Sequence, residues 1–365
     1  MNLNPIAERF AIEGKIAKIE PLGGGLINST YRIFTEGDAP DYVLQNVNVA
    51  VFPDIKLLMS NIKAVTEHIR AKLTAAHTDD IERKVLRFIP LADDPNQYFY
   101  YDGEKYWRIM VYIPRTTSKS GVSEETAYIV GETFAGFQAM LADIDAEMGE
   151  TIKDFHNMEW RIQQLRDAIK ANPKGRADEP EVKGIVEEIL SRADEMCKAE
   201  RLYREGKLPK RICHCDTKLD NILFDEDGNV LCVIDLDTVM PSFIFSDYGD
   251  FLRSAANTTV EDDPDLSKVG FNFSIFKSFT KGYLAGARSF LTPIEIEHLP
   301  YATALFPYMT LTRFIADYIN GDIYFHCQYP EHNLVRSRNQ LKLLHCIEAA
   351  FPEMEAFIQT QLSNR

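Results

Sequence analysis

The stretch HCDTKLDNILF, residues 214–224, places residues that could support phosphoryl chemistry at a fixed spacing. Asp216 precedes Asn221 by five residues, and Asp235 follows within the apolar stretch VIDLDT. Phosphoryl transfer needs a carboxylate that orients the attacking hydroxyl and accepts its proton, and oxygen ligands that hold a metal against the phosphates. Carboxylate and amide oxygens are ligands that Mg²⁺ prefers. The two clusters could therefore serve a single phosphoryl-transfer site.

The chain between these residues predicts how they are positioned. The sequence ILF, then DEDGN, then VLCVID has the apolar strands and the Asp-Gly turn of a β-hairpin, which would place Asn221 and Asp235 at one end. Asp and Asn in turns often only cap backbone amides, but an aspartate after Val233 and Ile234 is hard to explain without a metal or a buried network. The pattern H-x-D-x-x-x-x-N followed by I-D matches a kinase catalytic loop, in which we interpret His214 as structural support.

The glycine-rich stretch LGGGLINSTYRI is the candidate phosphate-binding loop. Gly23, Gly24 and Gly25 permit close approach of backbone amides to phosphate oxygens, although such loops are also common as plain hairpin turns. The run YWRIMVYIPR, a strand leading into a linker, is where an adenine would meet backbone groups. Met110 and Tyr112 are therefore candidate nucleotide contacts.

The apolar periodicity changes along the chain. Residues 15–113 contain short β-branched or aromatic runs, IAKIEPL, STYRIF, YVLQNV, KVLRFI and YWRIMVYI, interrupted by one helix that starts at about Asp54. Helical spacing dominates later, with Ser123 as an N-cap and helices predicted at 180–206, 265–286, 294–319 and 333–350. We predict an α+β, protein-kinase-like bilobal fold: residues 1–113 form a small antiparallel-sheet N-lobe that binds nucleotide, 114–121 a linker, and 122–365 a larger, mainly helical C-lobe with the catalytic loop and the acceptor site.

Composition excludes several classes of protein. The chain has 365 residues, 45% of them hydrophobic, and a net charge of -15, which disfavours a nucleic-acid partner. We find no secretory signal and no membrane span, and we expect a cytoplasmic protein that is a monomer or a weak homo-oligomer. The six cysteines contain no C-x-x-C pair and suggest reduced thiols. Cys213 and Cys215 alternate along a strand around His214 and so do not suggest zinc.

These motifs resemble the phosphotransferase family that contains the aminoglycoside phosphotransferases and choline kinases, and most narrowly its N-acetylhexosamine 1-kinases. The resemblance extends over the stretches EPLGGGLINSTY, YVLQNVN, HCDTKLDNIL to IDLDTVMP, DYGDFLR, TRFIADYINGDIYF and YPEHNLVRSRNQLKL. It implies ATP- and Mg²⁺-dependent phosphorylation of the anomeric hydroxyl of N-acetylglucosamine or N-acetylgalactosamine. The small-molecule ligands would then be a sugar and a nucleotide.

The resemblance also implies roles for individual residues. Asp216 would be the catalytic base, Asn221 and Asp235 the metal ligands, and Asp250 a brace for the catalytic loop. Asn28, Arg313 and Tyr324 would line the sugar pocket. Arg313 could instead form a helix-surface ion pair with Asp317, four residues later, and Tyr324 could simply pack.

The sequence departs from the wider superfamily at Gln45, where a cation usually stands. Glutamine cannot neutralise phosphate charge, so the source of positive charge stays open. Lys218, inside the catalytic loop, is the first candidate for contacting the transferring phosphoryl group, and Arg87 and Arg108 are weaker ones.

Three alternatives to a sugar kinase remain. The first is a kinase of the same fold for choline, homoserine or an aminoglycoside. The second is a nucleotide-binding pseudokinase, although retention of Asp216, Asn221 and Asp235 argues against it. The third is a mucin-desulfating sulfatase, which is disfavoured because no cysteine lies in the C-x-P-x-R sequence that such enzymes need.

Overall fold

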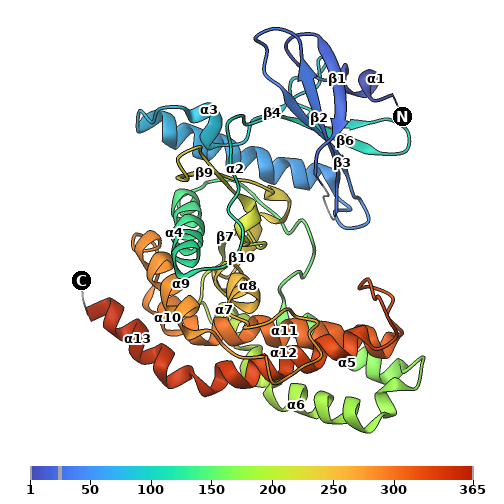
Figure 1. The fold of residues 1–365 in the computed structure, drawn as a ribbon, viewed down its shortest axis with the longest axis vertical. Helices are drawn as coiled ribbons and strands as arrows, with labels where there is room; N and C mark the ends of the chain where they lie inside the picture. Colours follow the sequence, from blue (N-terminus) through green and yellow to red (C-terminus); the bar gives the residue numbers. More distant parts are fainter. Residues whose placement is uncertain (1, 24–26, 364–365) are drawn as a thin grey trace. The chain divides into compact units, whose positions relative to one another are not determined.

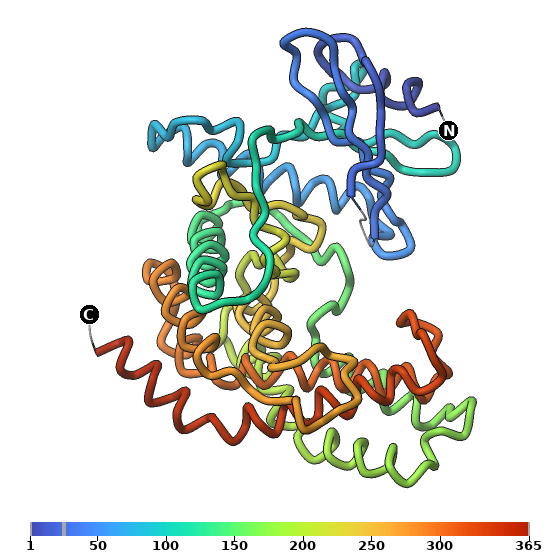
Figure 2. Tube along the Cα trace, viewed as in Figure 1, coloured from blue at the N-terminus to red at the C-terminus, as the bar shows by residue number. Residues whose placement is uncertain are grey.

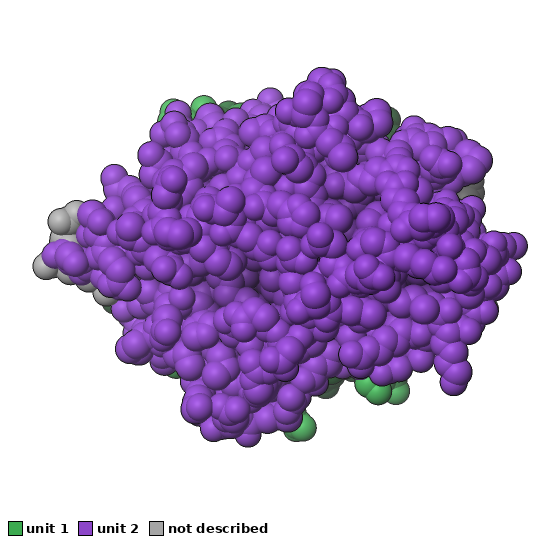
Figure 3. Space-filling model, turned by 90° about the horizontal axis from the view of Figure 1, so that it is seen from below, with its two compact units in different colours: residues 1–119, 143–153, 220–240 green, residues 120–142, 154–219, 241–365 purple. Residues whose placement is uncertain are grey.

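The structure is a computed structural model that describes residues 2–23 and 27–363. The chain forms two compact units, coloured separately in Figure 3. Unit 1 comprises residues 1–119, 143–153 and 220–240, and unit 2 comprises residues 120–142, 154–219 and 241–365. The units are interleaved in sequence, unlike the contiguous lobes predicted above, because two later segments pack with the first 119 residues.

Unit 1 is built on an antiparallel sheet with the order β1-β2-β3-β6-β4, in which β5 also pairs with β6. Its strands are β1 (Ile16–Pro21), β2 (Ser29–Thr35), β3 (Tyr42–Val47), β4 (Phe88–Ile89), β5 (Tyr100–Tyr101) and β6 (Tyr106–Val111). Ile33 on β2, Leu44 on β3 and Ile109 on β6 are fully buried in one apolar cluster with Phe10 and Trp107. The apolar runs that the sequence indicates as strands therefore pack together in one core.

Helix α2 (Ile55–Ala75) begins where the sequence predicts. The Asp54 side chain caps it by accepting a hydrogen bond from the Leu57 amide, and Leu58, Ile62 and Val65 are fully buried. The short helices of unit 1 are α1 (Asn4–Ala7) and α3 (Ile81–Lys84). The strand predicted for KVLRFI is mostly wrong, because Lys84 ends α3 and only Phe88–Ile89 pair with β6.

The predicted hairpin is present as β8 (Ile222–Phe224) and β9 (Val230–Val233). The carboxylate of Asp225 orders its turn by accepting hydrogen bonds from the amides of Asp227 and Asn229, and Gly228 has a φ of 82°. An isolated bridge between Thr117 and Phe224 ties the hairpin to the rest of unit 1. The short 3₁₀ segment η3 (Leu236–Thr238) follows β9.

Unit 2 is mainly helical, and α12 runs alongside α11 in both views of the chain (Figures 1 and 2). Its helices are α4 (Glu124–Leu141), α5 (Met158–Ala171), α6 (Pro180–Met196), α7 (Lys198–Arg204), α8 (Phe245–Ala255), α9 (Phe273–Gly286), α10 (Pro293–Glu297), α11 (Leu299–Asn320), α12 (His332–Ala349) and α13 (Phe351–Ser363). Its remaining short elements are β7 (Arg211–Cys213), β10 (Met240–Ser242), η1 (Arg176–Asp178) and η2 (Leu219–Asn221). Both β10 and η2 straddle the boundary between the units.

Close packing of α4 against α9 explains glycines in both helices. A Cβ on Gly282 would lie 2.1 Å from the carbonyl oxygen of Tyr128, and one on Gly131 would lie 2.3 Å from that of Phe279. Ser123 caps α4 as predicted, in a capping box with Thr126. Within the part of the chain that the structure describes, no helix has the length and apolarity needed to cross a membrane.

Candidate functional site

The predicted catalytic loop lies in unit 2, between β7 and η2, and two aspartates of α8 hold its backbone. Asp247 accepts hydrogen bonds from the amides of His214 (3.0 Å) and Cys215 (2.7 Å), and Asp250 accepts one from the amide of Thr217 (3.1 Å). Cys215 has a φ of 63°, a left-handed conformation that non-glycine residues rarely adopt without such support. The turn thereby fixes the backbone on both sides of Asp216.

Asp216 carries a charged neighbour within the loop. The Nζ of Lys218 lies 2.7 Å from its Oδ2, and both side chains are partly exposed. Burial raises the pKa of Asp250 to about 6, and the negative charge of Asp216 contributes to this rise. The residues predicted as base, phosphoryl contact and brace are therefore neighbours in unit 2, and their roles stay predictions.

Buried residues behind the loop form a chain of hydrogen bonds that the sequence did not predict. Gln138 on α4 donates to Asp247 (2.8 Å) and accepts from the hydroxyl of Tyr283 on α9 (2.6 Å). Burial raises the pKa of Asp247 to about 6. The ring of His214 is fully buried, edge-on to Phe134 and to Phe137. An aspartate in the apolar helix FSDYGDFLR was the available signal for Asp247, because a buried carboxylate needs donors.

The predicted metal ligands lie together at one end of the hairpin in unit 1. The amide of Ile234 donates to the carbonyl of Asn221 (3.0 Å), which extends the pairing of Ile222 with Val233. Asp235 follows directly, exposed and left-handed with a φ of 59°. Proteins usually supply only one or two oxygen ligands to Mg²⁺. Asp235 and Asn221 offer one carboxylate and one amide oxygen, so these two residues fit the ion.

Gln45 belongs to a buried polar network rather than standing alone. Its cross-strand partner on β6 is Arg108, which donates through Nε (3.0 Å) and Nη2 (2.8 Å) to the Gln45 Oε1. The Nη1 of Arg108 lies 2.6 Å from the Oδ1 of Asp237, and both side chains are almost fully buried. The cation of this region is therefore Arg108, on the neighbouring strand, and Asp237 already neutralises it.

Asn28, predicted at the sugar site, is part of the same network. Its Nδ2 donates to Asp237 (2.7 Å), and its Oδ1 accepts from the amide of Asn48 (2.9 Å). Both ends of this amide are thus engaged within unit 1. A sugar contact by Asn28 stays a prediction and would require a donor or acceptor beyond these two bonds.

The candidate nucleotide residues lie at two places in unit 1. Gly23 has a φ of 67°, which suits a glycine turn after β1, whereas Gly24 and Gly25 lie outside the described residues. Met110 pairs with Val43 on one side and Phe88 on the other. The Tyr112 amide donates to the carbonyl of Asp41 (2.9 Å), so this N–H is already bonded.

Arg313 and Tyr324, predicted at the sugar site, contact each other in unit 2. The Nη2 of Arg313 lies 3.4 Å from the Tyr324 hydroxyl, and its guanidinium lies 5.6 Å from the ring centre. Asp317 does not pair with Arg313, because its carboxylate accepts the amides of Ile323, Tyr324 and Phe325. The surface ion-pair interpretation is therefore wrong within the described chain. In the loop that Asp317 holds, 71% of the Tyr324 surface is exposed.

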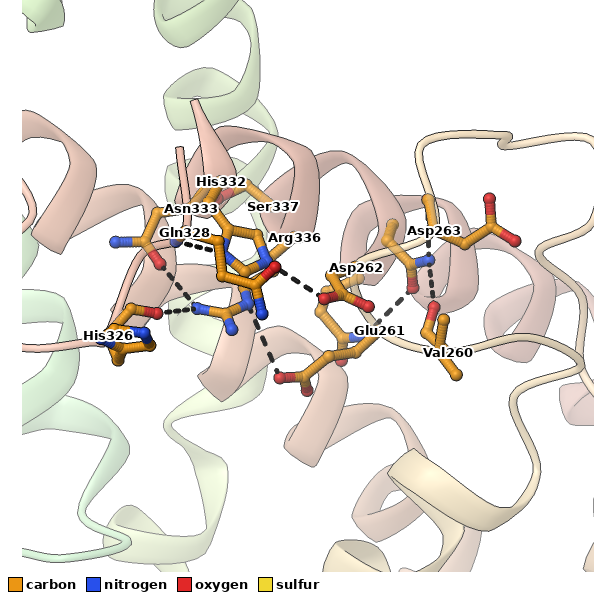
Figure 4. A network of polar contacts seen from close by, with 12 residues as sticks. Val260, Glu261, Asp262, Asp263, His326, Gln328, His332, Asn333, Arg336 and Ser337 are labelled. Carbon is orange, nitrogen blue, oxygen red and sulfur yellow. Dashed lines mark hydrogen bonds and ion pairs between the residues drawn. The ribbon is translucent and has the colours of Figure 1, made fainter. Parts of the chain in front are cut away.

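The acidic segment of residues 261–263, which follows α8, contacts side chains of α8 and α12 (Figure 4). Asp262 lies 3.1 Å from the Nε2 of buried His332, whose Nδ1 accepts the Gln328 amide. Glu261 pairs with Arg253 (2.7 Å) and lies 3.9 Å from the Nε of Arg336. The acidic segment thus links α8 to α12, and its Glu261 forms an ion pair with Arg253.

Comparisons with known proteins agree with this architecture. The phosphotransferase enzyme family matches residues 18–271. An aminoglycoside phosphotransferase from Alicyclobacillus acidocaldarius has a similar structure, with a TM-score of 0.56 and 12% identity over 98% of this chain and 94% of that one. A choline kinase from Cryptosporidium parvum Iowa II gives 0.54 and 13% over 93% of each chain. A spectinomycin phosphotransferase in complex with ADP and spectinomycin gives 0.53 and 12% over 96% of each. The predicted kinase-like fold class is confirmed.

Proposed function

This chain belongs to the phosphotransferase enzyme family, and from that premise we propose that it transfers a phosphoryl group from ATP to the anomeric hydroxyl of an N-acetylhexosamine. The family and the neighbouring folds support a small-molecule phosphotransferase. The acceptor is the proposed part. The observation that favours a sugar is the contact between Arg313 and the exposed ring of Tyr324.

That contact has the chemistry of carbohydrate recognition. An exposed aromatic ring can cover the apolar face of a sugar, and a guanidinium supplies several donors to its hydroxyl and carbonyl oxygens. A cationic acceptor such as choline would instead favour an aromatic cage without a nearby positive charge. The choline kinase among the neighbours shares only the fold at 13% identity, so it does not decide the acceptor.

The proposed chemistry assigns a task to each residue of the catalytic segment. Asp216 accepts the proton of the attacking hydroxyl, and Lys218, 2.7 Å from it, contacts the transferring phosphoryl group. Asn221 and Asp235 would hold Mg²⁺, which when bound offsets phosphate charge. Gly23, Gly24, Gly25, Gln45, Met110 and Tyr112 are the proposed nucleotide contacts, and Asn28 is a third sugar contact.

Phosphorus NMR of the purified protein with Mg-ATP tests this proposal. Separate tubes contain N-acetylglucosamine, N-acetylgalactosamine, glucose, choline and homoserine. A new resonance with the proton coupling of an anomeric phosphate, in the amino-sugar tubes, is expected. A product in the choline or homoserine tube would establish the alternative kinase. Unchanged ATP everywhere, with nucleotide binding shown by a thermal shift, would favour the pseudokinase.

A further inference from the structure

Two arginines of unit 2 are unusual in a chain with 55 acidic and 40 basic residues. Among the described arginines that are not exposed, Arg161 and Arg313 are those without an ion pair to a carboxylate. A buried or half-buried guanidinium is normally compensated by a carboxylate. In so acidic a protein, two uncompensated ones in the same unit need an explanation.

Arg161 uses only part of its hydrogen-bonding capacity. Its Nη2 donates to the carbonyl of Phe155 (2.6 Å), and its Nη1 donates to the side chain of Gln164 (2.8 Å). Its Nε is buried without a hydrogen-bond partner among the described residues. A guanidinium carries five N–H donors, so most of this side chain's donors remain available.

Arg161 and Arg313 lie on two helices that pack against each other. Helix α5, which carries Arg161, packs along α11, which carries Arg313. The ring of His156 stacks on Phe155, with centres 4.2 Å apart, and meets Phe306 of α11 edge-on at 4.9 Å. Phe306 and Arg313 are seven residues apart on α11 and hence on one face, because seven residues make about two helical turns.

The electrostatics of the two side chains agree with this proximity. Burial, followed by the positive charge of Arg313, lowers the pKa of Arg161 to about 10. The same two causes hold the pKa of His156 well below its usual value, so this ring adds no charge. The carboxylates that act on the pair are Asp154, toward Arg161, and Asp250, toward Arg313, and Arg253 adds a further positive charge near Arg313.

We propose that Arg161 and Arg313 form an oxygen-binding subsite of unit 2 that receives polar substituents of the acceptor and selects uncharged or anionic acceptors over cationic ones. Two neighbouring guanidinium groups without carboxylates are stabilised by carbonyl, carboxylate or phosphate oxygens and destabilised by an ammonium group. Arg161 then becomes a specificity residue that neither the sequence motifs nor the family resemblance identified.

This inference rests on the proposed function, because it assumes that unit 2 binds the acceptor. The matched probes are N-acetylglucosamine, which is uncharged, and glucosamine, whose amine is largely protonated below neutral pH. Both present the same anomeric hydroxyl. Their kcat/KM values at pH 6.5 report whether the acceptor site discriminates charge.

The test compares Arg161→Gln with Arg161→Lys, which keeps the charge, and with Arg166→Gln, an exposed arginine of the same helix. Loss of one charge-assisted interaction should raise the KM for N-acetylglucosamine about 10- to 100-fold in Arg161→Gln, with kcat and the KM for ATP within about threefold. The preference for N-acetylglucosamine over glucosamine should fall by a similar factor. Arg161→Lys should keep most of that charge preference, and Arg166→Gln should match the wild type.

Separate outcomes identify which idea fails. If Arg161→Gln keeps the wild-type KM and the wild-type preference, the subsite is refuted while the sugar kinase stands. If no acceptor is phosphorylated, the proposed function fails, and calorimetric titration with inorganic phosphate at low ionic strength tests the subsite alone. Phosphate binding that is weakened by Arg161→Gln but not by Arg166→Gln supports the subsite. Equal or absent binding in all three proteins overturns it.

Discussion

The buried ion pair between Arg108 and Asp237 permits a quantitative prediction about unit 1. The side chains are 2% and 4% exposed, and the Nη1 and Oδ1 atoms lie 2.6 Å apart. Asp237 Oδ1 has no directed hydrogen bond among the described residues, so the contact is mainly ionic. Removal of either partner leaves a buried charge without its counter-charge.

The magnitude follows from that uncompensated charge. Asp237→Asn and Arg108→Met should each lower the free energy of unfolding by about 3–5 kcal/mol. The double variant leaves neither charge, so it should be destabilised by less than the sum of the single variants, with a coupling of at least about 2 kcal/mol. Asn28 can still bond an asparagine at position 237, which limits other losses.

The assay is urea unfolding of the wild type, both single variants and the double variant. The control cycle uses Lys63 and Glu67, an exposed pair four residues apart on α2, for which about 0.3–0.5 kcal/mol is expected. High salt should weaken the control pair and leave the buried coupling nearly unchanged. A coupling between Arg108 and Asp237 as small as that of the control would refute the argument that burial makes this pair matter.

Three further predictions concern unit 2. Asp216→Asn should lower turnover by at least about 100-fold in a steady-state assay while nucleotide binding in a thermal-shift assay stays near that of the wild type. Gly282→Ala should unfold at lower urea concentration than the wild type, because its Cβ would lie 2.1 Å from the Tyr128 carbonyl, whereas Gly184→Ala, with open space around it, should gain up to about 1 kcal/mol. The pKa of Asp250 is raised from 3.8 to about 6, so its ionisation removes stability as the pH rises through this range. The unfolding free energy of Asp250→Asn relative to the wild type should therefore increase by up to about 3 kcal/mol between pH 4 and 7, and a flat difference would contradict the raised pKa.

Local signals in the sequence predicted much of the fold. The Asp-Gly turn predicted the hairpin, and Asp54 and Ser123 predicted the starts of α2 and α4, because capping and turn chemistry depend on neighbours in sequence. The predicted start of a helix at Asp265 is wrong. Asp265 instead bonds the amide of Ser267 in a turn, and Asn272 caps α9, which begins at Phe273.

Contacts between distant parts of the chain were beyond the sequence. Asp247 meets the loop amides 32 and 33 residues away, and Arg108 meets Asp237 across more than a hundred positions. The absence of a cation at position 45 was visible in the sequence, but the pairing of Gln45 with Arg108 on the adjacent strand depends on sheet register. A one-residue shift of β6 would turn Arg108 to the other face.

The ion pair between Arg108 and Asp237 has a consequence for nucleotide binding. Gln45 carries no charge, and the charge of Arg108 is balanced by Asp237, so the described part of this network offers no net positive charge to a triphosphate. Under the proposed function, the phosphates would be stabilised by backbone amides, by Lys218 and by the cation that Asn221 and Asp235 would hold. Since amides contribute only partial charges, ATP affinity in this protein should depend more steeply on Mg²⁺ than in a kinase whose strand lysine faces the phosphates.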